Sequence, residues 1–78
     1  METEFRKEVD KALDDLEQLA DEVRVKLHLA ELDARDAWSL KLEPRLFEAR
    51  MHAREATAAS KAAIEATAKA FRDFVDTI

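Results

Sequence analysis

Apolar residues recur along the first third of the chain at the spacing of one helix face. The steps between them are four, three, four, three and four residues, which is the coiled-coil-like spacing that packs one helix against another. The pattern then takes an extra step of four to Leu27 and resumes at Ala30 and Ala34. We therefore predict a first helix that begins near Thr3, with a stripe made of Phe5, Val9, Ala12, Leu16, Leu19 and Val23.

Residues 23–32, VRVKLHLAEL, alternate between apolar and polar positions, which is also the pattern of a half-buried strand. We interpret the stretch as helix, because helical geometry resolves the alternation into two interleaved stripes. One stripe continues the seam of the first helix through Ala30. The second lies on the opposite face and consists of Val25, Leu29 and Leu32.

The second half of the chain repeats the heptad-like spacing with smaller residues. Small residues at a seam let two helix axes approach closely while large side chains of the other helix fill the space. The seam consists of Leu42, Leu46, Ala49, Ala53, Ala56, Ser60, Ala63, Thr67 and Ala70, followed by Phe71, Phe74 and Ile78. These positions predict a second long helix.

The position of the connection is open, because two cues disagree. Pro44 fits best in the first turn of a helix and pushes Glu43 away from helical angles, which favours a late turn just before it. In that register residue numbers sum to about 80, so that Val9 meets Phe71. An N-cap at Asp33 favours an early turn instead, with a helix kinked at Pro44. A single kinked helix that pairs only between chains is the third alternative.

The chain contains no glycine and one proline, so tight turns with positive φ should be few and hairpin-rich β structure is disfavoured. We predict an all-α fold in a single domain, residues 1–78, with the connection within residues 32–43. The expected architecture is a long antiparallel helical hairpin with coiled-coil-like packing. Two such hairpins would form a four-helix bundle, as a homodimer or in a larger tetramer.

Self-association is expected because apolar residues outside the seams would leave a patch in water. A chain of 78 residues also has a marginal core of its own, which association would supplement. The predicted interface consists of Val25, Leu29, Leu32, Trp38, Leu40, Phe47 and Met51. The function expected first is a self-associating scaffold or protein–protein interaction module.

The distribution of charge along the chain indicates an alternative function. The net charge is −5, which disfavours general binding to nucleic acid. Residues 1–23 carry nine acidic and three basic side chains, whereas residues 24–54 carry five acidic and seven basic. A binding module for an acidic protein or nucleic acid could use those seven: Arg24, Lys26, Arg35, Lys41, Arg45, Arg50 and Arg54.

The Ala- and Thr-rich residues 49–70 give a further alternative. In composition this stretch resembles the amphipathic helices of phasins, which coat granule surfaces. The resemblance involves no specific motif, and it implies a surface-coating role.

Candidate chemistry is sparse. His28 and His52 would lie at one level in the late-turn register, but the nearby carboxylates are off the seam and make a metal site unfavourable. The sequence contains no cysteine and no arrangement typical of nucleophilic catalysis, so we expect neither an enzyme nor a cofactor. No apolar run is long enough for a transmembrane segment, and a cytoplasmic location is the default expectation.

Overall fold

The computed structural model describes residues 3–78, which fold as helices joined by short connections. The elements are α1 (Thr3–Leu27), α2 (Leu32–Ala37), the π-helical segment η1 (Trp38–Leu42), α3 (Glu43–Ala53) and α4 (Ala58–Thr77). Because α2, η1 and α3 follow one another without a break, we refer to residues 32–53 as the middle helix. The predicted all-α class is confirmed for the described residues.

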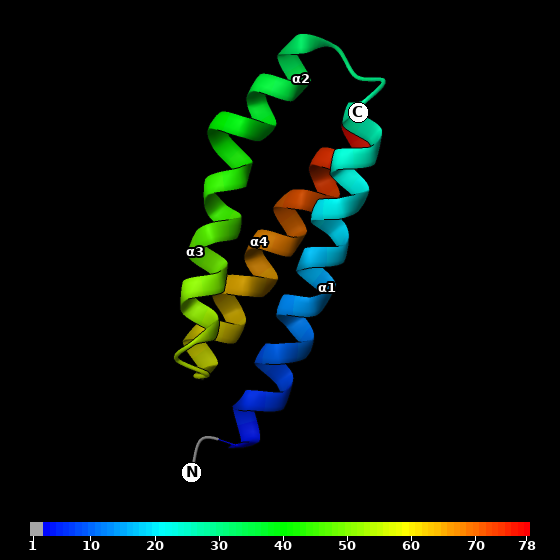
Figure 1. Ribbon diagram of the computed structural model, residues 1–78. Helices are drawn as coiled ribbons and strands as arrows, with labels where there is room; N and C mark the ends of the chain where they lie inside the picture. Colours follow the sequence, from blue (N-terminus) through cyan, green and yellow to red (C-terminus); the bar gives the residue numbers. More distant parts are fainter. Residues whose placement is uncertain (1–2) are drawn as a thin grey trace.

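The chain forms a rod of three helices, 46 × 17 × 14 Å. The middle helix runs antiparallel to α1, and α4 then returns in the same direction as α1 (Figure 1). Polar contacts fix this parallel pair at both ends. Lys61 pairs with Glu8 near one end, and the Nζ of Lys26 donates to the carbonyl of Val75, 3.4 Å away, near the other.

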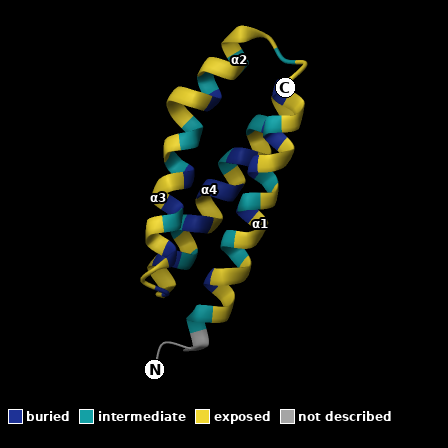
Figure 2. Ribbon diagram, viewed as in Figure 1, coloured by how far each residue is buried: buried dark blue, intermediate teal, exposed yellow. Residues whose placement is uncertain are grey.

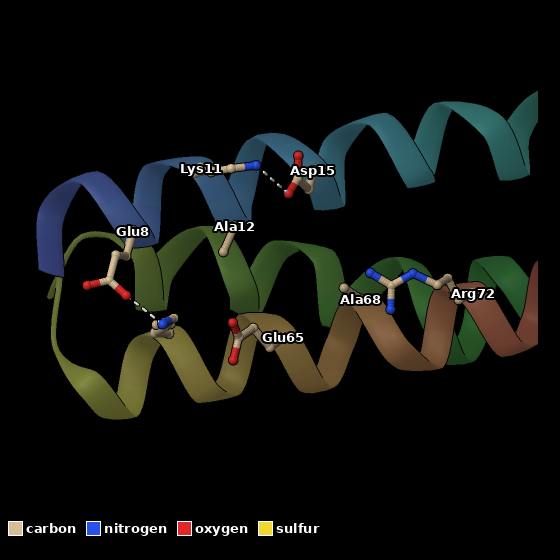
Figure 3. Close-up of a pocket in the computed structure, with 8 residues that line it drawn as sticks. Glu8, Lys11, Ala12, Asp15, Glu65, Ala68 and Arg72 are labelled. Carbon is tan, nitrogen blue, oxygen red and sulfur yellow. Dashed lines mark hydrogen bonds and ion pairs between the residues drawn. The ribbon is translucent and has the colours of Figure 1, made fainter.

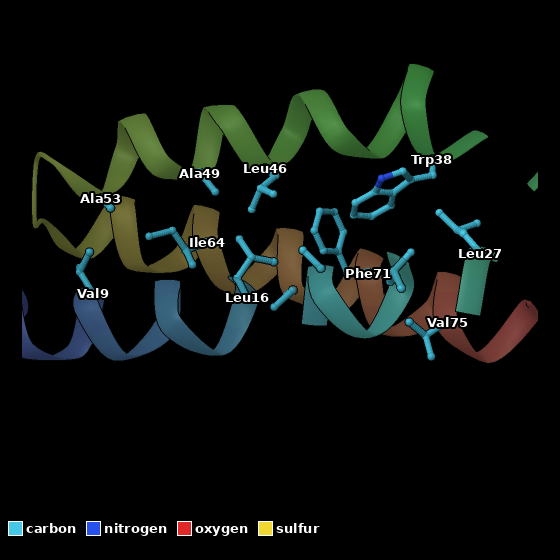
Figure 4. Packing of buried hydrophobic residues seen from close by; sticks show 13 residues of the cluster. Val9, Leu16, Leu27, Trp38, Leu46, Ala49, Ala53, Ile64, Phe71 and Val75 are labelled. Atoms are coloured by element: carbon cyan, nitrogen blue, oxygen red, sulfur yellow. The ribbon is translucent and has the colours of Figure 1, made fainter. Parts of the chain in front are cut away.

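The expected two-helix hairpin is therefore corrected to a three-helix bundle within one chain. Residues 32–43, where the connection was expected, are helical, and the chain reverses at residues 28–31 and again at residues 54–57. Val9 lies beside Ala53 at one end of the core, and Phe71 lies beside Trp38 at the other (Figure 4). The pairing of Val9 with Phe71 thus does not occur.

The first connection corresponds to the early-turn alternative, with the boundary shifted by two residues. Glu31, not Asp33, is the N-cap, with extended backbone angles of φ −71° and ψ 163°. Its side chain accepts no capping hydrogen bond from the described residues. Pro44 lies in the first turn of α3, as its fixed φ favours, yet the helix continues before it through η1.

The second connection was missed because it contains neither glycine nor proline. Ala56 adopts the left-handed conformation with φ 51°, a position that usually selects glycine. Thr57 then caps α4, its Oγ1 accepting from the backbone N–H of Ser60 at 3.1 Å. The side chain of Ser60 is buried against this cap, with its Oγ 3.0 Å from the Oγ1 of Thr57.

The core is one cluster drawn from all three helices (Figure 4). The predicted stripe of α1 is confirmed at Val9, Leu16 and Val23, which are fully buried. Each helix contributes both large and small side chains to the interior. The buried apolar side chains opposite α1 are Trp38, Leu46, Ala49 and Ala53 from the middle helix, with Ile64, Ala68, Phe71 and Val75 from α4.

Trp38 is a core residue, which corrects its assignment to the predicted interface. Its ring is 4% exposed and lies edge-on to Phe71, with the ring centroids 4.9 Å apart. It also stacks near Phe74, and the Arg24 guanidinium lies 5.8 Å from its centroid. The aromatic group closes the core near the first connection.

We expect the two large apolar side chains of η1 to differ sharply in their contribution to stability. Trp38→Ala should lower the free energy of unfolding by about 3–5 kcal/mol, the range for removing a buried aromatic side chain. Leu40→Ala should change it by no more than about 0.5 kcal/mol, because Leu40 is 75% exposed. Denaturant titration at low protein concentration measures both values. Equal losses would contradict this placement of Trp38.

The left-handed turn gives a second prediction. Ala56→Val should destabilise the fold by about 2 kcal/mol or more, because a β-branched residue is unfavourable at positive φ and the site is buried. Ala56→Gly should have an effect below about 1 kcal/mol, since relief at positive φ offsets the lost methyl group. Thermal melts should show a fall of about 8–16 °C for the Val variant alone. A tolerated Val would contradict the turn geometry.

Candidate interaction surface

The middle helix has two apolar faces on opposite sides. Its inner face is buried in the core, and its outer face points to solvent (Figure 2). Four large apolar side chains on the outer face are each 57–75% exposed: Leu32, Leu40, Phe47 and Met51. We call this set the outer face.

The π-helical segment keeps both faces in line. A π turn contains one more residue than an α-helical turn, which rotates everything after it by about 100°. This rotation brings Trp38 and Leu46 onto the same inner side and places Phe47 and Met51 on the side of Leu32. The backbone N–H of Glu43 donates to the carbonyl of Trp38 across this wide turn, just before Pro44, which has no N–H to donate.

Two further exposed apolar residues lie beyond the outer face. Val25 on α1 is 68% exposed, and Leu29 in the first connection is 95% exposed. Six of the seven residues predicted for an interface are thus large apolar side chains in solvent, and Trp38 is the exception.

Ion pairs hold the middle helix against α1 along one edge of the outer face. The Nε and Nη2 of Arg50 donate to the two carboxylate oxygens of Glu17 at 2.6 and 2.8 Å. The Arg50 guanidinium also lies 5.4 Å from the ring centroid of Phe47. A second pair, Arg24 with Glu43 at 3.5 Å, lies farther along the same two helices.

The hydrogen bonds from Arg50 hold the pKa of Glu17 below its usual value of 4.5. Burial opposes this shift, and the nearby charges of Arg50 and Arg24 add smaller effects that lower the pKa. The same contact raises the pKa of Arg50. Glu8 likewise raises the pKa of Lys61 by accepting its hydrogen bond. The charged forms of all three groups are therefore favoured in the folded chain.

Basic side chains also close the carboxyl ends of the helices. Arg35 donates to the carbonyls of Leu27 and His28 at the end of α1, each at 3.0 Å. Arg6 donates to the carbonyls of Ala53 and Arg54 at the end of α3, at 2.9 and 3.1 Å. Cations suit these positions because helix carboxyl ends present unpaired carbonyls and partial negative charge.

These contacts involve several cations of residues 24–54, the basic segment of the alternative binding site. Four of its seven cations have internal roles: Arg24 and Arg50 in ion pairs, and Lys26 and Arg35 at helix ends. These four side chains therefore contribute to the packing of the bundle.

The two histidines lie at opposite ends of the middle helix. His28 precedes it in the first connection, whereas His52 lies near its carboxyl end with its Nδ1 3.8 Å from Glu55. The late-turn register, which would have placed them level, does not occur. Among residues 3–78, no group of three or more His, Cys, Asp and Glu side chains is arranged to hold a metal ion.

An open groove of about 440 Å³ runs between α1 and α4. Ala12 and Ala68 line it together with side chains of both charges, as Figure 3 shows. Lys61 pairs with Glu8 across it and Lys11 pairs with Asp15 along one wall. The alternation of charge gives the groove no preference for an anionic or a cationic ligand.

Comparison with protein-family models, curated proteins and solved structures gives no match for this chain. None of the helices in the described part of the chain is long and apolar enough to cross a membrane. The case for a function therefore depends on the surface just described.

The Glu17–Arg50 contact predicts a specific dependence of stability on pH. Because the folded-state pKa of Glu17 is depressed, its contribution is present above about pH 4.5 and is lost as pH falls through the folded value. Glu17→Gln should cost roughly 1 kcal/mol at pH 7. The difference from the wild type should shrink between pH 7 and pH 3, as the folded chain begins to bind a proton at Glu17.

Urea titrations at both pH values provide the measurement. Glu22→Gln is the matched control, since Glu22 is an exposed carboxylate on the same helix for which the described residues provide no ion pair. A Glu17→Gln penalty that is the same at both pH values would exclude a charged native contact.

Proposed function

We propose that this chain is a non-catalytic, self-associating helical module that uses the outer face of the middle helix to bind a second copy. The observation that carries the proposal is the exposure of four large apolar side chains along one helix, opposite a fully packed inner face. An apolar surface of this kind marks an interaction site more often than it marks a free surface.

The size of the outer face supports a stable contact. From Leu32 to Met51 it extends for about 28 Å along the helix. Burying each large apolar side chain contributes about 1.5–3 kcal/mol. In a twofold dimer each copy presents the same surface, so the contribution counts twice.

Since each chain contains three helices, side-by-side association of two bundles gives six helices in place of the four expected from two hairpins. Val25 and Leu29 lie outside the outer face and provide a second surface through which dimers would pair into tetramers. The homodimer is the primary assembly in this proposal.

The alternatives receive less support. An acidic partner would have to be held by the three cations of the middle segment that lack an internal role above, Lys41, Arg45 and Arg54. A surface-coating role would need the apolar side of α4, and Ile64, Phe71 and Val75 on that side are buried within the bundle.

Leu40→Glu tests the proposed function. A charge in a buried apolar contact is strongly unfavourable, so the dimer dissociation constant should rise by 100-fold or more while far-ultraviolet circular dichroism stays helical. Sedimentation equilibrium at micromolar concentration gives the mass. The matched control is Ala62→Glu, which adds the same charge at an exposed position of α4 and should leave the dimer intact.

A wild-type chain that sediments as a folded monomer at these concentrations would refute self-association. A Leu40→Glu chain with undiminished dimerisation would refute the outer face as its interface.

A further inference from the structure

The core stripe of α1 continues in phase through the first connection into the middle helix. Its positions follow from Val23 in steps of four, three, four and four residues: Leu27, Ala30, Ala34 and Trp38. On one uninterrupted helix these residues would lie within about 80° of one another. A chain that only folds back on itself at residues 28–31 has no need for this continuity, because the two helices could bury unrelated faces.

The backbone of the first connection is close to helical. The N–H groups of His28, Leu29 and Ala30 each donate to the carbonyl three residues earlier, at 3.1–3.3 Å. The N–H of Ala34 already donates to the carbonyl of Glu31. Glu31, with ψ 163°, is the residue that interrupts the helical path.

The residues of this connection do not enforce a turn. His28, Leu29, Ala30 and Glu31 include no glycine and no proline, and the Glu31 side chain accepts no capping bond from the described part of the chain. The second connection also lacks glycine and proline, but it has a left-handed residue and a threonine cap. The first connection is therefore the weaker of the two reversals.

We propose that two copies of this chain exchange α1, with the first connection straightened so that residues 3–53 form one helix. Each copy then places its α1 against the middle helix and α4 of the other. The inference rests on the proposed self-association but gives the two copies a different contact: the exchanged α1 joins them through the core, and the outer face of the middle helix stays exposed on the dimer. Four helices, two long and two short, make up this dimer.

Exchange preserves the contacts of the single chain. Arg50 of one copy binds Glu17 of the other, and Arg24 binds Glu43 in the same way. Both pairs are centred between residues 33 and 34, so the twofold axis passes there. Ala30 and Ala34, which face the core, lie beside this axis, where small side chains let the two long helices approach closely.

Straightening also satisfies the backbone groups at the connection. In a continuous helix the carbonyls of Leu27 and His28 accept from the N–H groups of Glu31 and Leu32, which replaces the two hydrogen bonds from Arg35. The equilibrium between the single-chain bundle and the exchanged dimer then depends on protein concentration. This holds in general for exchange of an element between identical copies.

An intrachain distance measurement distinguishes the two forms. Gln18 and Glu48 are exposed and lie level on α1 and α3, near the Glu17–Arg50 pair. In the single-chain fold they are separated by no more than the 17 Å width of the rod. In a continuous helix their separation is about 45 Å. The chain has no native cysteine, so Gln18→Cys with Glu48→Cys accepts spin labels cleanly.

The labelled chain is refolded from denaturant at high concentration with excess unlabelled chain, and the dimer is isolated by size. Pulsed electron–electron double resonance then measures the distance between the two spin labels of one copy. A distance near 45 Å in the dimer supports exchange. A short distance in the dimer overturns exchange and leaves the proposed self-association intact, whereas absence of any dimer overturns both.

Leu32→Pro provides the matched variant. Proline suits the first helical position of α2, and Glu31 already has the extended angles that precede proline. In a continuous helix proline would break the path, so the exchanged dimer should weaken by more than 100-fold while the single chain stays folded. Leu32→Ala removes the same outer-face side chain, which exchange leaves in solvent, without breaking the helical path, so its dimer should retain the long distance. Equal behaviour of the two variants would overturn the proposal.

Discussion

Closing the carboxyl ends of its helices is the constraint on which the rest of this structure depends. A helix leaves its last carbonyls unpaired, and glycine in the left-handed conformation is the usual means of satisfying them. This chain has no glycine. Long cationic side chains from neighbouring segments donate hydrogen bonds to these carbonyls instead: Arg35 at α1, Arg6 at α3 and Lys26 at α4. Each of these contacts also joins two elements, so the ends of the helices and their packing are stabilised together.

The second constraint comes from Pro44 in the middle helix. Proline inside a helix removes one hydrogen bond and clashes with the carbonyl four residues earlier. The wide turn of η1 absorbs this defect and adds a rotation that aligns Trp38 with Leu46. The same rotation aligns the outer apolar residues, so one local irregularity positions both the core and the candidate interaction surface.

The sequence allowed the helical class, the stripe of α1 and the six exposed large apolar residues to be predicted, because each depends on periodicity. It did not allow the number of helices to be predicted. Ala56 has no feature that marks it as a left-handed residue, and the cap at Thr57 is visible only as one threonine before an alanine-rich run. Trp38 continues the stripe of α1 in phase, but it was assigned to the interface because it flanks the expected connection. The roles of Arg6 and Arg35 depend on tertiary proximity, which spacing along the chain does not reveal.

An odd number of helices places Thr3 and Ile78 at opposite ends of the 46 Å rod (Figure 1). A pull applied between these two residues would act along the helix axes and would slide α1 past its neighbours. All the core contacts and the lateral ion pairs resist such a load together. In a hairpin whose two ends are adjacent, the same pull would break the contacts one after another. The bundle is thus suited to resist extension along its length.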